Sequence, residues 1–250
     1  MKSIFPFDYL LEIFINNYYI CTDNPKNTDY LCKISIMTVK IEKELSKVKT
    51  HIIDYASIKS ILMNMGYVNV NDKINHLKKK GILKPIKKGL YYHSSIISNN
   101  ILSKEVLANT ILGPSYISLE YALAYHGLIP ESVHQLTSVS TKRSKEYRTE
   151  AGVFSYKQIR KDLFSLGLKI EQIRDARFMM ATKEKAICDM IYLTRGISLL
   201  SQKALIVFLE DDLRIDIDDL KDIDIEVLRA YYQVCKSKQI AILLKLIESI

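Results

Sequence analysis

Residues 70–94 combine basic side chains with a regular apolar pattern. The stretch holds seven lysines against a single acid, Asp72. Val70, Ile74 and Leu77 recur at a spacing that places them on one side of a helix, which leaves the amide and basic side chains on the other. Ammonium groups neutralise phosphates, and amides hydrogen-bond to base edges. The stretch is therefore a candidate surface for binding a polyanion.

The polar side of this predicted helix is centred on Asn75, His76 and Lys79. In a major groove we expect Asn75 to contact adenine and Lys79 to contact guanine, with His76 as a hydrogen-bonding companion. The other residues that we expect to contact DNA are Asn71, Lys73, Lys78, Lys80, Lys84, Lys87 and Lys88. The alternatives are a merely solvated helix face, or a membrane surface, for which the exposed side lacks apolar anchors.

Two helices should precede this one and help to position it. The first begins at Thr38, with Ile41 and Leu45 on its inner side. The second occupies residues 57–65, with Ser57 as its N-cap and Gly66 at its end. A short turn at residues 67–69 then leads into the basic helix, which Asn69 or Asn71 should cap and Gly81 should end.

A β-hairpin should follow the basic helix. Residues 82–86 and 90–93 read as strands around a turn at residues 87–89, where Gly89 supplies the positive φ. Pro85 places the first strand at a sheet edge, because proline lacks the amide hydrogen. Three helices followed by a hairpin is the order of a winged helix-turn-helix.

The composition bounds the rest of the chain. With 250 residues, 48% of them hydrophobic, and only 8 glycines and 5 prolines, we expect two domains and an α+β, predominantly helical fold. The net charge of +8 favours polyanionic partners. The domains would be an extension of unknown role (1–36), a winged helix-turn-helix (37–95), and a mixed α/β domain with a small sheet and a helical tail (96–250).

The cysteines and the N-terminal apolar stretch bear on the compartment. The four cysteines contain no C-x-x-C pair, which suits reduced thiols better than zinc or a disulfide framework. Asp8 and Glu12 interrupt the apolar stretch, which therefore fits neither a signal peptide nor a membrane span. We expect a soluble, cytoplasmic protein.

The second domain should alternate helices and strands. Three helices are predicted. One spans residues 103–112, one follows an N-cap at Ser118, and one spans residues 182–195 with Thr182 as its N-cap. Strands are predicted at 134–141 and 151–159, joined by a charged loop at 142–150, and extended segments at 167–173 and 177–181. The tail from residue 200 should be helical with acidic loops, since residues 210–229 hold nine acids against three bases.

Four runs of the second domain resemble a known family. They are GPSYISLEYALAYHGLIPE (113–131), TSVSTKRSKE (137–146), FSY (154–156) and ATKEKAICDMIYL (181–193). In order and spacing they resemble AbiEi-type antitoxins of type IV, abortive-infection toxin–antitoxin systems. The segment ending in KKGLY (87–91) resembles the N-terminal domain of that family. The resemblance covers about residues 40–200; the acidic tail fits only loosely, and residues 1–36 do not fit.

The resemblance implies a repressor that binds double-stranded DNA at inverted repeats in its own promoter. It also implies a C-terminal domain that counteracts a co-encoded nucleotidyltransferase-fold toxin without requiring a stable complex. The implied antitoxin or second basic surface comprises Ser118, Glu120, Tyr121, Thr141, Lys142, Arg143, Lys145, Arg148, Glu184, Lys185 and Asp189. Simpler interpretations remain open, since Ser118 suits an N-cap, Glu120 and Asp189 suit core ion pairs, and the basic segment suits a solvated loop.

The alternative from another class is an enzyme that modifies the toxin or its nucleic-acid substrate, for example an atypical kinase. The sequence has no P-loop, no dinucleotide-binding glycine pattern and no H-E-x-x-H motif. We therefore expect no catalytic residue, no cofactor and no metal site. If the chain is nevertheless an enzyme, its activity should depend on Glu184 or Asp189.

Overall fold

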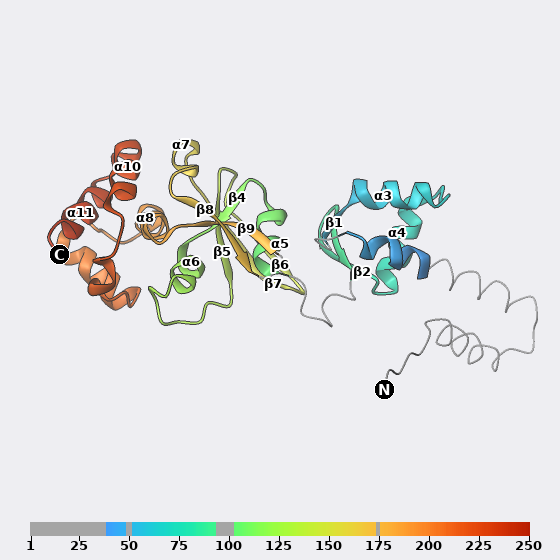
Figure 1. The fold of residues 1–250 in the computed structure, drawn as a ribbon, viewed down its shortest axis with the longest axis horizontal. Coiled ribbons are helices and arrows are strands. Elements are labelled where there is room, and N and C mark those ends of the chain that lie inside the picture. Colours follow the sequence, from blue (N-terminus) through green and yellow to red (C-terminus); the bar gives the residue numbers. More distant parts are fainter. Residues whose placement is uncertain (1–38, 49–51, 94–102, 174–175) are drawn as a thin grey trace, which may run out of the picture.

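The computed structural model describes residues 39–48, 52–93, 103–173 and 176–250 of the chain (Figure 1). The structure is mixed α/β, with more residues in helices than in strands. The predicted extension, residues 1–36, lies outside the described residues. Within those described ranges, no helix combines the length and the apolar character that crossing a membrane requires.

Three helices open the described part of the chain. Residues 39–46 are helical, α3 spans Tyr55–Asn64 and α4 spans Val70–Lys79. Their apolar stripes pack together, as the spacing predicted, with Ile41, Leu45, Ile58, Leu62, Val70, Ile74 and Leu77 buried in one core. The prediction of Ser57 as N-cap was wrong. Asp54 caps α3, and its carboxylate accepts a hydrogen bond of 2.7 Å from the Ser57 amide.

A small antiparallel sheet accompanies these helices. The predicted hairpin is present as β2 (Leu83–Lys87) and β3 (Leu90–His93), and Gly89 has a φ of 79° in its turn. The sheet order is β1-β3-β2, so β2 with Pro85 is an edge strand, as predicted. The sequence did not reveal β1 (Ile52–Asp54), which is only three residues long.

Both faces of the small sheet are buried. Because side chains alternate along a strand, Ile53 and Leu83 pack on the helices, whereas Ile52 and Tyr92 join the core of the second half of the chain. Ile86 and Leu90 lie in that second core as well. In Figure 1 the small sheet lies on the side of α3 and α4 that faces β6 and β7. The sheet thus connects two hydrophobic cores.

The second half is built on a six-stranded sheet in the order β6-β7-β5-β4-β9-β8. The strands are β4 (Ser115–Ile117), β5 (Leu136–Ser140), β6 (Lys145–Thr149), β7 (Gly152–Gln158), β8 (Leu168–Ile173) and β9 (Ala176–Ala181). The helix α5 (Lys104–Ile111) precedes β4, α6 (Leu119–Tyr125) connects β4 to β5, and α7 (Lys161–Phe164) connects β7 to β8.

The prediction of a loop at 142–150 was wrong for residues 145–149. These residues form β6, which pairs antiparallel with β7. Charged Glu146 and Arg148 alternate with Tyr147, whose ring packs edge-on against Tyr156 with 5.9 Å between centroids. A single aromatic side chain that packs on the neighbouring strand can therefore hold a charged segment as an edge strand.

The C-terminal part is helical, as predicted. It contains α8 (Lys183–Leu193), α9 (Gln202–Val207), α10 (Ile225–Cys235) and α11 (Lys238–Ile247). A π-helical turn at Phe208–Asp212 (η2) and a 3-10 turn at Ile217–Leu220 (η3) hold part of the acidic stretch, which we had expected in loops. In Figure 1, α8 lies between the large sheet and the pair α10 and α11. It is therefore buried on most of its surface.

Gly167, just before β8, lies close to side chains of α8 and α10. Its φ is +59°, and a Cβ added there would lie 3.0 Å from Cβ of Lys185 and 3.1 Å from Cγ1 of Val227. Both the left-handed backbone and the crowding therefore require glycine.

We expect Gly167→Ala to lower the free energy of unfolding by about 2–4 kcal/mol, because the backbone penalty and the overpacking add. Gly196→Ala is the matched control, since Gly196 has a φ of +83° with no atom within 4 Å of an added Cβ. The control should cost only the backbone penalty, about 1–2 kcal/mol. Chemical denaturation measures both values, and equal losses would contradict the packing at Gly167.

Candidate functional site

The solvent-facing side of α4 carries the side chains that we expected to meet DNA. Its exposed residues include Asn75, His76, Lys78, Lys79 and Lys80. The opposite side, with Val70, Ile74 and Leu77, is buried against the other helices. The hydrophobic core thus holds α4 by one stripe and directs the amide, imidazole and ammonium groups outward.

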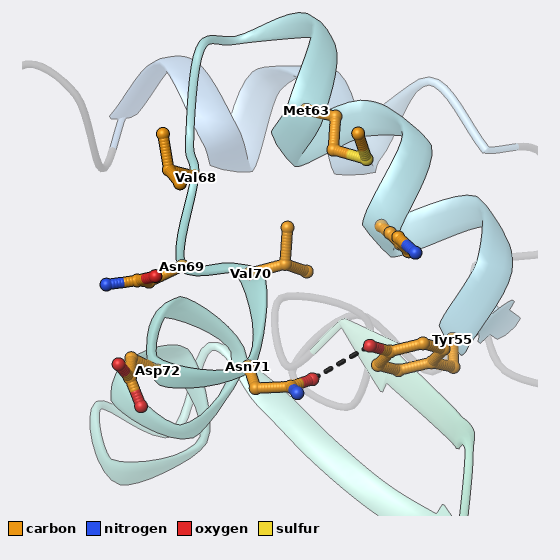
Figure 2. A pocket seen from close by; sticks show the side chains of 8 residues that line it. Tyr55, Met63, Val68, Asn69, Val70, Asn71 and Asp72 are labelled. Carbon is orange, nitrogen blue, oxygen red and sulfur yellow. Dashed lines mark hydrogen bonds between the residues drawn. The ribbon is translucent and has the colours of Figure 1, made fainter.

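The beginning of α4 borders a shallow pocket formed with α3 (Figure 2). Asn71 lies in this pocket, and its side-chain oxygen accepts a hydrogen bond of 2.8 Å from the Tyr55 hydroxyl. The turn between the two helices exposes Val68, which is 93% accessible. Asn69 occupies the N-cap position, one of the two predicted for α4, but its side chain makes no capping hydrogen bond.

The surroundings of two side chains on α4 lower their pKa values. The Lys73 ammonium lies 4.9 Å from the centre of the Tyr67 ring, and partial burial lowers its pKa. Partial burial and the nearby charges of Lys80, Lys73 and Lys79 lower the pKa of His76. His76 is therefore neutral at pH 7 and can supply hydrogen bonds rather than charge.

Lys84 and Lys87 were expected to face phosphates, and the structure corrects this. The Lys84 ammonium lies 3.1 Å from the Glu150 carboxylate, and the Lys87 ammonium donates a hydrogen bond of 2.5 Å to the Ile111 carbonyl oxygen. Both ammonium groups are thus engaged by the second half of the chain, because the face of the small sheet that carries them packs there. Lys88, at the tip of the hairpin, remains exposed.

Glu150 is the acceptor at the centre of this contact. It also accepts a hydrogen bond of 3.2 Å from the Tyr92 hydroxyl. The hydrogen bond from Lys84 lowers the pKa of Glu150, whereas burial and then Glu150 raise the pKa of Tyr92 to about 12. The phenol therefore stays protonated and donates to an ionised carboxylate. Through Glu150, the turn after β6 is joined to the small sheet.

The residues of the implied second surface fall into three groups. Lys142, Arg143, Lys145 and Arg148 are exposed and Thr141 is half-buried, all of them in or just before β6, which contacts β2. Glu120 is exposed on α6. Tyr121 is half-buried beside it and donates to Glu105.

The third group does not lie on a surface, contrary to expectation. Ser118, Lys185 and Asp189 have no accessible area, and Glu184 is only 6% accessible. For Glu184, Lys185 and Asp189 the reason is that α8 is covered by α6, α10 and α11. Glu184 accepts a hydrogen bond of 3.4 Å from the Asp224 amide.

Asp189 is the centre of a buried polar network. Its carboxylate accepts hydrogen bonds of 2.9 Å from each of three hydroxyls, those of Tyr116, Ser118 and Tyr231. The Lys185 ammonium lies 3.5 Å from it and donates at 2.8 Å to the Leu163 carbonyl oxygen. The same ammonium lies 4.7 Å from the Tyr116 ring centre and 5.2 Å from that of Tyr231.

Burial dominates the electrostatics of this network. It raises the pKa of Asp189 and lowers that of Lys185, while the attraction between the two opposes both shifts. Burial, followed by Asp189, also raises the pKa values of Tyr116 and Tyr231. Both phenols therefore remain protonated donors, and the carboxylate is solvated by side chains in place of water.

Ser118 and Thr182 were both predicted to be N-caps, with different outcomes. Thr182 caps α8, and its hydroxyl accepts from the Lys185 amide. Ser118 occupies the cap position of α6, but its hydroxyl donates to Asp189. Thr137 from β5 takes over the capping role and accepts a hydrogen bond of 3.0 Å from the Tyr121 amide.

Sequence reasoning missed Tyr116, Tyr231 and Glu150. Tyr116 and Ser118 stand two residues apart at a strand end, and Lys185 and Asp189 stand four apart on a helix, so each pair shares a face. These spacings were a usable signal for four members of the network. The contributions of Tyr231 and Glu150 depend on tertiary packing, which no local spacing reveals.

The described ranges contain no cluster of three or more histidine, cysteine or acidic side chains able to hold a metal ion. Comparison of the sequence with protein-family models and with curated proteins finds no match.

We expect Asp189→Ala to lower the free energy of unfolding by about 3–5 kcal/mol, because it leaves a buried ammonium and three hydroxyls without their acceptor. The double variant Lys185→Met/Asp189→Asn should recover much of this loss, since it removes the charge and keeps an oxygen acceptor. Denaturant unfolding followed by circular dichroism measures both values.

Asp219→Ala is the matched control for the loss of an aspartate, because Asp219 is exposed. It should change stability by no more than about 0.5 kcal/mol. An Asp189→Ala variant as stable as this control would show that the network does not support the fold.

Proposed function

We propose that this chain is a cytoplasmic DNA-binding antitoxin. Through residues 37–95 it represses its own toxin–antitoxin operon by binding inverted repeats in the promoter. Through residues 96–250 it counteracts a co-encoded nucleotidyltransferase-type toxin. The observation that carries the DNA-binding part is the exposed face of α4, where amide and basic side chains project away from the core.

We assign residues 37–95 to the winged helix-turn-helix class. The order of elements supports this assignment: a helix, the short strand β1, the helices α3 and α4, and the hairpin of β2 and β3. In that class the second helix of the pair enters the major groove. Here that helix is α4, whose outward side presents Asn75 and Lys79 to base edges.

The phosphate contacts follow from which ammonium groups are exposed. We assign Lys78, Lys80 and Lys88 to the DNA backbone, and we leave out Lys84 and Lys87, which contact the second half of the chain. The exposed basic residues of the β6 region, among them Lys142 and Arg148, adjoin the small sheet, since β6 contacts β2. Their position favours additional phosphate contacts.

The antitoxin part of the proposal rests on the resemblance of residues 113–193 to AbiEi-type antitoxins. With Ser118, Lys185 and Asp189 buried, a toxin or its substrate could meet only the exposed members of the implied surface, such as Glu120 and Arg143. We assign the buried members to the stability of the domain.

Asn75→Ala tests direct reading of the promoter. We expect it to weaken binding to the promoter upstream of this gene by about 1–3 kcal/mol and to leave binding to random duplex unchanged. Asn64→Ala, which removes an exposed amide from the end of α3, should bind like the wild type. Fluorescence anisotropy with both duplexes measures the difference. A wild-type protein with no preference for its own promoter would refute the proposal.

Lys88→Ala and Lys87→Ala test the assignment of the hairpin tip. We expect Lys88→Ala to flatten the slope of log affinity against log salt by about 0.9, the value for one lost phosphate contact. Lys87→Ala should leave that slope unchanged, because its ammonium is bound to the Ile111 carbonyl. Titrations at several salt concentrations give both slopes. A flattened slope for Lys87→Ala alone would reverse the assignment.

A further inference from the structure

The two edge strands of the large sheet carry different side chains. On β6 the exposed residues Lys145, Glu146 and Arg148 are charged, and this strand contacts β2. At the other edge, β8 exposes Ile170, which is 73% accessible, and Ile173, which is 37% accessible. Charged side chains protect an edge from pairing, whereas exposed apolar side chains promote it. The edge suited to pairing is therefore β8.

Asn109 reveals which way the backbone of β8 faces. Its side chain accepts a hydrogen bond of 2.6 Å from the Met179 amide and donates one of 3.4 Å to the Met179 carbonyl. These backbone groups of β9 therefore point away from β8. Ile170 is the antiparallel partner of Met179, so these two residues form a pair without hydrogen bonds between them. The amide and carbonyl of Ile170 therefore point sideways, away from β9 and beyond the edge of the sheet.

Ile170 and Met179 also form an apolar patch. They lie directly opposite each other on the same face of the sheet, and Met179 is 36% accessible. The outward backbone of Ile170 thus lies beside an exposed apolar surface. Together these features provide hydrogen bonds and apolar area for one more strand.

We infer that β8 pairs antiparallel with β8 of a second copy of this chain, about a twofold axis at Ile170. The Ile170 residues of the two copies then lie opposite each other and exchange their backbone hydrogen bonds. Lys169 of each copy lies opposite Glu171 of the other. The two six-stranded sheets become one continuous sheet, and a twofold contact of this kind closes at a dimer.

The charges of β8 select this register. A twofold axis keeps like faces together only if it passes through one residue of each strand. The charges distinguish the centres at and beside Ile170, namely Lys169, Ile170 and Glu171. Centring on Lys169 places two ammonium groups opposite each other, and centring on Glu171 does the same with two carboxylates. Only the centre at Ile170 sets each ammonium opposite a carboxylate. Within one copy, Lys169 already pairs with Glu171, so four alternating charges would meet at the axis.

Charge reversal on the full-length protein tests the pairing. Sedimentation equilibrium, without DNA, should show a dimer for the wild type. Lys169→Glu and Glu171→Lys should each raise the dimer Kd by about 10–100-fold, because each places like charges opposite each other twice. The double variant Lys169→Glu/Glu171→Lys restores opposite charges and should dimerise like the wild type. Arg148→Glu, on the other edge strand, should not change the Kd.

The results separate clearly. Recovery of the dimer in the double variant supports the register, and circular dichroism checks that each variant is folded. The inference would be overturned if the wild type stayed monomeric at every concentration or formed higher oligomers. It would also be overturned if neither single charge reversal changed the dimer Kd. A double variant that stays monomeric would overturn it as well. Because no DNA is present, none of these outcomes depends on the proposed repressor function.

Discussion

The structure depends on a small sheet that has no free face. Ile53 and Leu83 belong to the core beneath the helix of residues 39–46, α3 and α4, while Ile52 and Tyr92 belong to the core of the large sheet. The alternation of side chains along β-strands makes this possible with very few residues. The face of the small sheet that carries Ile52 and Tyr92 also carries Lys84 and Lys87. The packing that joins the two halves therefore also decides which lysines remain available to a ligand. Among the basic residues that we expected to bind DNA or form the second surface, those on α4, at the tip of the hairpin and in the region of β6 remain exposed.

Elements with a strong local signal could be predicted from the sequence. The apolar spacing of residues 58–65 and 70–77 gave α3 and α4, and Pro85 and Gly89 gave the edge strand and its turn. The orientation of the basic side of α4 followed from the same spacing. By contrast, β1 is too short to show a pattern, and β6 looked like a loop because only Tyr147 distinguishes it from a charged linker.

The residues of the second half show where sequence reasoning ends. Lys185 and Asp189 have the charges of a surface pair, yet they are buried, because three hydroxyls and two aromatic rings replace water around them. One of those hydroxyls comes from Tyr231, far along the chain. A buried ion pair of this kind is tolerated only when every partner is present. It therefore ties the sheet, α8 and α10 into one cooperative unit, even though local spacing identifies only some of its members.

The two edges of the large sheet complete this organisation. The β6 edge adjoins the N-terminal half, so a pair formed through β8 would carry its two α4 helices at opposite ends of a twelve-stranded sheet. With about 4.8 Å between neighbouring strands, the two β6 strands would be roughly 50 Å apart. One turn of DNA separates adjacent half-sites by about 34 Å. A repressor assembled in this way would therefore fit inverted repeats whose centres lie more than one helical turn apart, and the spacing would follow from the number of strands between β6 and the twofold axis.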